Sequence, residues 1–213
     1  MTEAWPLRPS AGWPSQPPVS EPRNRDAILT AAAALASTDG LDGPSAATLA
    51  MALGRGWDGL RGSRARQELQ LAVVTEAGRI FDEEVIQPAL AAPAGLGQLA
   101  AVCEAFFAHL ERHACPGGCF MASAALEMGT RGGPVRDSIT ALQGQFGELI
   151  RGFAAAAVAG NELPAGEDPG LLAFELNGIM LATDTNFVQH DDPAVLDLAR
   201  QIVRQRLGVG IES

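Results

Sequence analysis

The chain has 213 residues, 47% of them hydrophobic, and a formal net charge of -10 at pH 7. This length and composition allow one or two compact units with a buried core. No apolar stretch approaches the roughly 20 residues that span a bilayer, and the first residues lack the charged start and continuous apolar run of a signal peptide. These features argue against a membrane-spanning or secreted protein, so we expect a cytoplasmic protein with no membrane partner.

Residues 1–22 are a proline-rich arm. Six of them are proline and two are tryptophan, Trp5 and Trp13. Proline at this density precludes a regular helix, so we expect a flexible or polyproline-like segment. Two interpretations stay open: a disordered tail, or an arm that lies across the domain that follows or across a partner.

Two short helices joined by a glycine turn are predicted next. In Arg25 to Gly40, four apolar residues share one helix face, and Leu41 packs back after the closing turn. The four residues of this face are Ile28, Ala32, Leu35 and Ala36. In Ser45 to Gly54, the small residue Ala50 lies four positions before Gly54, a spacing that lets a second helix approach closely and allows positive φ at the turn. This pattern is typical of a helix-turn-helix, whose following helix enters a DNA groove.

The remainder of the chain reads as further helices separated by clear breaks. A long amphipathic helix is predicted from Glu68 to a stop near Pro88. Five more helices are expected, at Leu96 to Ala114, Phe120 to Met128, Pro134 to Ala159, Asp168 to His190 and Asp192 to Leu207. Asp168 is a plausible N-cap, because Pro169 follows at the first helical position. With a short third helix in residues 55–66, this gives an all-α fold of about nine helices.

This succession of helices resembles the TetR family of one-component transcriptional regulators. The resemblance rests on Arg25 to Gly40 as first helix, Ser45 to Gly54 as second and Glu68 to Pro88 as fourth. The segment GGCFMASAALEM, residues 117–128, is similar to sensor-domain sequence in some of these regulators. The resemblance implies three parts: the flexible arm 1–22, a helix-turn-helix DNA-binding domain at 23–66, and a helical sensor and dimerisation domain at 67–213. It also implies a ligand-released repressor that binds a pseudo-palindromic double-stranded DNA operator as a homodimer, without enzymatic activity or cofactor.

The third helix, which would read DNA, departs from the pattern of that family. Where a small apolar residue usually follows the turn glycine, this chain has Arg55, and the aromatic ending is replaced by RGSRAR at residues 61–66. Two glycines in so short a helix cost about 1 kcal/mol each relative to alanine. The residues expected to contact DNA are Ser45, Arg55, Gly56, Trp57, Asp58, Arg61, Arg64 and Arg66. The alternative hypothesis is a TetR-like fold that has lost DNA reading and serves as a ligand-binding or protein-interaction module.

The distribution of charge favours the DNA-binding interpretation. Residues 23–66 hold six arginines and four acidic residues, a net charge of +2, whereas residues 67–213 have a net charge of -11. Basic groups therefore lie where phosphate contacts are needed, and the acidic remainder is repelled by the duplex. A merely solvated face is the alternative interpretation of these arginines.

An effector site is expected among the central helices. Large adaptable side chains with a few polar groups are the common lining of a small-molecule site. The candidates are Phe106, Phe107, Phe120, Met121, Met128, Phe146, Phe153 and Met180, with Asn177 and Asp184 as polar anchors. They indicate a small apolar or aromatic effector, although aromatic residues and methionines at helical spacing are also typical of plain core.

The helix at 168–190 is apolar nearly all round, which predicts a second packing surface. Its apolar residues are Leu171, Leu172, Phe174, Leu176, Ile179, Met180 and Leu181. A helix on the surface of a monomer needs only one buried stripe, so the second face points to a ligand pocket or to another chain. In a TetR-like dimer, the last two helices of each subunit form a four-helix bundle, which places two reading helices about one DNA turn apart.

Two other site types are weaker hypotheses. His109, His113, Cys115 and Cys119 offer the donor set of a tetrahedral zinc site, but their spacing matches no standard metal motif. Cys115 and Cys119 could alternatively sense redox state, while Cys103 looks like core and an odd count of three cysteines predicts no disulfide framework. No catalytic constellation is apparent, because tyrosine and a phosphate loop are absent and the adjacent Glu83 and Glu84 would point apart on a helix.

Overall fold

The computed structural model describes residues 22–41, 63–113 and 115–209. Every regular element in these ranges is helical, which confirms the all-α class. The elements are α1 (Pro22–Asp39), α3 (Ser63–Phe81), η2 (Asp82–Ile86), α4 (Gln87–Ala91), α5 (Leu96–Glu111), α6 (Phe120–Met128), α7 (Pro134–Ala159), α8 (Pro169–His190) and α9 (Ala194–Leu207). Because α3, η2 and α4 follow one another without a gap, the described residues contain seven helices rather than about nine. The expected second helix and most of the third lie in residues 42–62, outside the described residues.

The connecting helix continues past Pro88, where the sequence predicted its end. A π-helical turn, η2, precedes the proline, and the Gln87 N–H donates to the Asp82 carbonyl five residues back. Proline cannot donate a backbone hydrogen bond, and the wider π turn changes the bonding pattern at this point so that the helix tolerates it. Gln87 also donates through Nε2 to the Asp82 carboxylate at 3.2 Å, which ties the turn together.

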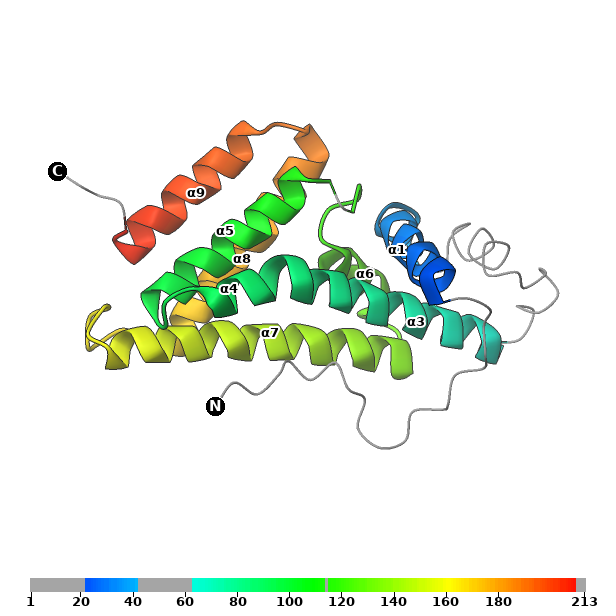
Figure 1. Cartoon of the computed structure of the whole chain (residues 1–213), viewed down its shortest axis with the longest axis horizontal. Helices are drawn as coiled ribbons and strands as arrows, with labels where there is room; N and C mark the ends of the chain where they lie inside the picture. The colour runs from blue at the N-terminus through cyan, green and yellow to red at the C-terminus, as the bar shows by residue number, and fades with distance from the viewer. Residues whose placement is uncertain (1–21, 42–62, 114, 210–213) are drawn as a thin grey trace.

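The helices pack around one continuous hydrophobic core. Figure 1 shows α7 lying alongside α3, with α1 at one end of α3 and with α5, α8 and α9 gathered around the other end of the connecting helix. The fully buried large side chains include Phe107, Leu99, Ile150, Leu172, Leu176, Met180 and Leu196. None of the described helices is long and apolar enough to cross a membrane.

Several predicted helix ends are confirmed. The bounds of α6 and α7 are those that the sequence predicted, and the Asp168 carboxylate caps α8 by accepting from the backbone N–H groups of Gly170 and Leu171 at 2.7 and 3.1 Å. By contrast, α5 ends at Glu111 rather than Ala114, and α9 begins at Ala194 rather than Asp192. The α5 helix stops early because His113 has a positive φ of 49°, which a right-handed helix cannot accommodate.

The buried face of α1 differs from the predicted one among the residues whose side chains the structure describes, which do not include Ile28. Leu35 is exposed, whereas Leu29 and Ala33 are buried together with the predicted Ala32 and Ala36. The buried stripe is thus rotated toward the small residues, because α1 packs closely on α3. Leu41 is buried after the turn, as predicted.

Candidate functional site

Most of the expected DNA contacts lie outside the described residues. Ser45, Arg55, Gly56, Trp57, Asp58 and Arg61 all fall in residues 42–62. Arg64 lies in the first turn of α3 by its backbone, and Arg66, in the same turn, has an exposed side chain. The expected DNA contacts therefore remain a prediction. What the described structure does show is how α1 and α3 are attached to each other and to the other helices.

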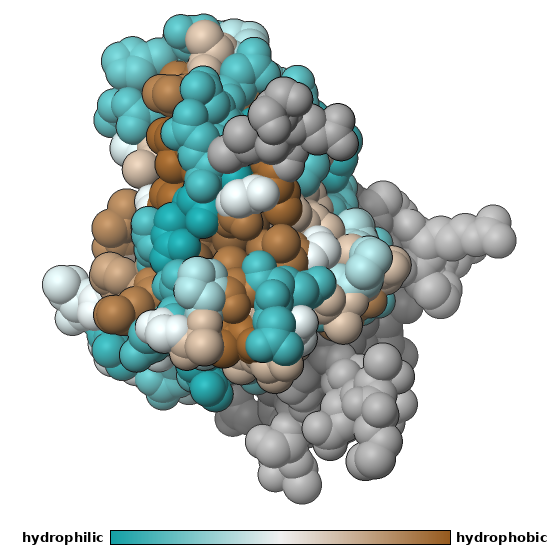
Figure 2. Space-filling model, turned by 90° about the vertical axis from the view of Figure 1, so that its left-hand side faces the viewer, coloured by the Kyte–Doolittle hydropathy of each residue, from teal (hydrophilic) through white to brown (hydrophobic). Residues whose placement is uncertain are grey.

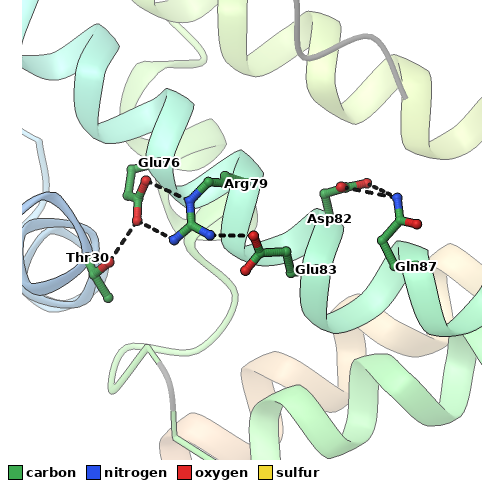
Figure 3. Close-up of polar contacts among 6 residues, drawn as sticks. All are labelled: Thr30, Glu76, Arg79, Asp82, Glu83 and Gln87. Atoms are coloured by element: carbon green, nitrogen blue, oxygen red, sulfur yellow. Dashed lines mark hydrogen bonds and ion pairs between the residues drawn. The ribbon is translucent and has the colours of Figure 1, made fainter. Parts of the chain in front are cut away.

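A chain of polar contacts joins α1 to the connecting helix. Figure 3 shows Glu76 of α3 between Thr30 of α1 and Arg79: the Thr30 hydroxyl donates to Glu76 Oε1 at 2.7 Å, and Arg79 donates to both Glu76 oxygens. Arg79 also pairs with Glu83 in η2. Burial raises the pKa of Glu76, but hydrogen bonds from Arg79 and Thr30 outweigh that effect and leave its pKa below the ordinary value. The ionised carboxylate, buried at the helix interface, is thus the form that holds α1.

The other end of the connecting helix is fixed to α5. The buried His109 places Nδ1 at 2.6 Å from Glu84 Oε2, and Arg112 Nη2 donates to the same oxygen at 3.0 Å. Burial raises the pKa of Glu84, but the hydrogen bonds from His109 and Arg112 outweigh that effect. The pKa of Glu84 therefore lies below its ordinary value. Sequence reasoning passed over Glu84 as a structural link, because only the fold brings it to His109. Glu83 and Glu84 do point to different partners, as predicted for adjacent residues.

The predicted effector residues lie mostly within the packed core. Phe106, Phe107, Phe120, Met121, Met128, Phe153 and Met180 are buried, and Phe146 and Asn177 are half-buried. Phe81 of α3 joins them: its ring meets Phe146 edge-on at 5.0 Å and Phe106 at 6.3 Å between centroids. Sequence reasoning missed Phe81 because it belongs to the connecting helix rather than to the central helices.

The two polar anchors differ in what the structure shows of them. Asp184 is buried, and one of its oxygens accepts the backbone N–H of Cys119, the residue just before α6, at 2.8 Å. Burial raises the pKa of Asp184 above its ordinary value, against the lowering effect of that hydrogen bond. Asp184 therefore already positions the α5–α6 loop, whereas Asn177 is half-buried on α8.

None of the predicted effector residues lines either of two hollows on the described part of the surface. One, of about 280 Å³, lies between the α5–α6 loop and the end of α8 and is lined by residues that include His113, Pro116, Gly118 and Phe187. The other lies where the end of α1 meets α6 and is lined by residues that include Ser37 and Glu127.

The zinc and redox hypotheses find no support in the described residues. His109 is engaged by Glu84, the His113 ring stacks on Phe187 at 5.3 Å between centroids, and no three His, Cys, Asp or Glu side chains described here gather as metal ligands would. All three cysteines are free and buried, and burial raises the pKa of Cys115 to about 11 and that of Cys119 to about 12. Such thiols are protonated at neutral pH, whereas the thiolate is the reactive form.

Comparison with known proteins identifies the class of the fold. A family model described as the tetracyclin repressor-like C-terminal domain matches residues 95–203, just over half of the chain. No curated protein matches the chain.

Three solved structures illustrate the likeness. A TetR transcriptional regulator from Chloroflexus aurantiacus has a TM-score of 0.76 at 20% identity, over 87% of this chain and 94% of that one. SCO4454, a TetR-family regulator from Streptomyces coelicolor, has a TM-score of 0.70 at 18% identity, over 87% and 95% of the two chains. AibR, solved in complex with isovaleryl coenzyme A and operator DNA, has a TM-score of 0.66 at 20% identity, over 85% and 97%. At these sequence identities, the structural similarity shows that the chains share a fold and nothing more.

Proposed function

The chain belongs to the TetR family of transcriptional regulators, and we propose that it is a repressor that binds a pseudo-palindromic operator as a homodimer and is released by a small apolar or aromatic effector. The observation that carries this proposal is the continuous helix α3–η2–α4. It holds α1 through Glu76 and the central helices through Glu84, eight residues further along. A rearrangement among the central helices would therefore tilt α1 and the DNA-binding domain to which it belongs.

An exposed apolar stripe on α8 and α9 supports the homodimer. While Leu172, Leu176 and Met180 of α8 are buried, Phe174 is 80% exposed and Leu171 is 70% exposed. The stripe consists of Leu171, Phe174, Leu181, Val188, Leu198 and Ile202. Figure 2 views the molecule from the end where α8 begins and α9 ends, and hydrophobic patches appear there between hydrophilic residues. A patch of this kind is a typical protein-protein contact, and a two-fold axis would pair it with its own copy.

The proposed effector site is the cluster in which Phe81, Phe106 and Phe146 meet. These rings belong to α3, α5 and α7, so a molecule inserted among them would act directly on the connecting helix. Methionines such as Met128 and Met180 can adopt other rotamers and make room for an apolar guest. AibR offers a precedent for this fold, because its structure contains both an acyl coenzyme A and operator DNA.

Selection of genomic fragments tests the DNA-binding part of the proposal. The full chain is mixed with sheared DNA of the host at low salt, and bound fragments are sequenced; we expect a pseudo-palindromic site to be enriched. A variant with Arg61→Ala and Arg64→Ala serves as the matched control and should enrich less DNA of every sequence, because phosphate contacts carry no sequence information. If the unmodified dimer enriches no sequence, the alternative of a TetR-like binding module without DNA reading replaces the repressor.

Titration of apolar and aromatic compounds tests the effector part. Binding to the protein and loss of operator affinity must be coupled reciprocally, typically by 1 to 3 kcal/mol. Ala124→Trp, which adds a large side chain to the buried core one helical turn after Phe120, should mimic the effector or block it. A compound that binds the central helices without changing operator affinity would show that this cluster is not the switch.

A further inference from the structure

The loop between α5 and α6 touches both α1 and α8, and Figure 1 shows it running beside α1. The backbone N–H of Gly117 donates to Ser37 Oγ in the last turns of α1 at 3.0 Å. Two residues later, the backbone N–H of Cys119 donates to Asp184 Oδ1 on α8 at 2.8 Å. Both acceptor side chains are buried, so water does not readily replace either bond. We call residues 117–119 the bridge.

Two glycines make the bridge fit tightly on both sides. A Cβ atom on Gly117 would lie 2.0 Å from the Ser37 carbonyl oxygen and 2.4 Å from its carbonyl carbon, so the backbone of α1 is in direct contact with the loop. Gly118 has a φ of +85°, and a Cβ atom there would lie 2.3 Å from Asp184 Oδ1 and 2.6 Å from Val188 Cγ2. At these two points α1, the bridge and α8 are in direct contact, and the hollow lined by Gly118 and Phe187 opens beside them. Close-packed groups transmit a displacement rather than absorb it.

The bridge contacts α1 at a different point from the connecting helix. The α3 helix holds Thr30 in the middle of α1, whereas the bridge holds Ser37 near its end. Helix α6, which starts directly after the bridge, extends this second attachment, because Glu127 near its end accepts the Leu41 backbone N–H at 2.7 Å. On the other side, Val188 belongs both to the contact with Gly118 and to the exposed stripe of α8.

We propose that the bridge is a second coupling element, which transmits the position of α8 to α1 without passing through the connecting helix. The role assigned to α1 rests on the proposed function, in which it is part of the DNA-binding domain. The orientation of that domain is then set at two points, and α8, the helix that carries the proposed dimer stripe, controls one of them. Ser37, Gly117 and Asp184 are positioning residues in this device.

Hydrogen exchange measured on the full chain without DNA tests the coupling. Asp184→Asn weakens the acceptor on α8 and should raise amide exchange about fivefold or more in the last turn of α1, although Asp184 bonds to the bridge and not to α1. Ser37→Ala removes the acceptor on α1, and its effect should reach the other side of the bridge. We expect it to raise amide exchange at Cys119 and at the start of α6. Glu175→Gln is the matched control: this carboxylate also lies on α8 and accepts a hydrogen bond, from Arg206, far from the bridge in sequence. It should leave α1 unchanged.

Exchange in α9 serves as the internal reference for global opening. The coupling is overturned if Asp184→Asn raises exchange only in α8 and the loop, or raises it equally in α1 and α9. It is also overturned if Ser37→Ala leaves Cys119 unchanged. Because this experiment uses no DNA, failure to find an operator would overturn the proposed function without affecting these results. Unchanged exchange in α1 would overturn only the proposed coupling through the bridge.

Discussion

The two ends of the connecting helix are held in different ways. On α1, the apolar residues that are buried are mostly small, with Ala32, Ala33 and Ala36 forming most of the stripe, and α1 also makes polar contacts, from Thr30 to Glu76 of α3 and from Ser37 to the bridge. Where α4 meets the C-terminal helices, large side chains such as Phe107 and Leu99 fill the core. Each buried methylene contributes about 0.8 kcal/mol, so the C-terminal helices form the more stable unit.

This difference fits a protein in which one part must be reoriented by the other. Alanines make close contacts but contribute little burial, so the attachment of α1 depends more on hydrogen bonds with defined geometry. A small shift of Glu76 or of the bridge changes those bonds directly. The C-terminal helices, with their larger core, keep the shape that an effector and a partner subunit would recognise.

A charge in the core of the C-terminal helices should have the largest effect. Leu176 is fully buried, so Leu176→Arg places an unpaired charge inside the subunit itself and not at its surface. Such a charge costs several kcal/mol, about 3 to 5 when a buried pair is broken, and we expect insoluble or unfolded protein. Far-UV circular dichroism measures the helicity of the variant, and the amount of protein left in solution measures its solubility. Soluble protein of unchanged helicity would show that this core is not the stable unit.

A charge two residues earlier on the same helix should separate folding from assembly. Phe174→Arg alters the exposed stripe, so we expect a folded monomer of unchanged helicity. Equilibrium sedimentation at micromolar concentration compares it with the unmodified chain, which should be a dimer. Gln189→Arg, an exposed change elsewhere on α8, is the control and should remain dimeric. The homodimer is refuted if the unmodified protein sediments as a monomer.

Removing the buried carboxylate that holds α1 should have an intermediate effect. Glu76→Gln loses the ion pair with Arg79 and weakens the bond from Thr30, which should lower the free energy of unfolding by about 1 to 3 kcal/mol. Glu148→Gln, which breaks a fully exposed pair with Arg151, should leave unfolding unchanged. Urea denaturation measures both variants, and an equal response to the two would contradict the polar attachment of α1.

The effect of Glu76 should depend on pH in a defined direction. Its pKa in the folded protein lies below the ordinary value of 4.5, so the ionised carboxylate contributes its full stabilisation above pH 4.5. That contribution is lost as pH falls through the lowered pKa. The difference in stability between the unmodified chain and Glu76→Gln should therefore shrink below pH 4.5, and a difference that grows in acid would exclude this assignment.

The smallest change should be in the response of DNA binding to salt. Arg61→Ala with Arg64→Ala removes two expected phosphate contacts from the basic N-terminal part, so the slope of log affinity against log salt should fall by about 2. Trp57→Ala should instead alter which sequence is bound. Titrations of a selected fragment at several salt concentrations measure the slope. An unchanged slope would place the phosphate contacts on other residues.

Local signals in the sequence determined much of the secondary structure. The bounds of α6 and α7, the Asp168 cap and the second apolar face of α8 were predictable, because prolines, glycines, caps and helical periodicity act within a few residues. The resemblance to TetR regulators rested on the same local patterns. The exposed stripe on α8 follows from composition alone, since one helix cannot bury apolar residues on all sides within one subunit.

Only the tertiary structure decided how the parts are joined. The bonds of Glu84 with His109, Cys119 with Asp184 and Gly117 with Ser37 connect residues 25, 65 and 80 positions apart. The continuation of the helix through Pro88 likewise depended on the π turn before it, which overrode the local rule that proline ends a helix. Such contacts depend on how whole helices pack, and packing is set by all the neighbouring side chains together, which no short stretch of sequence contains.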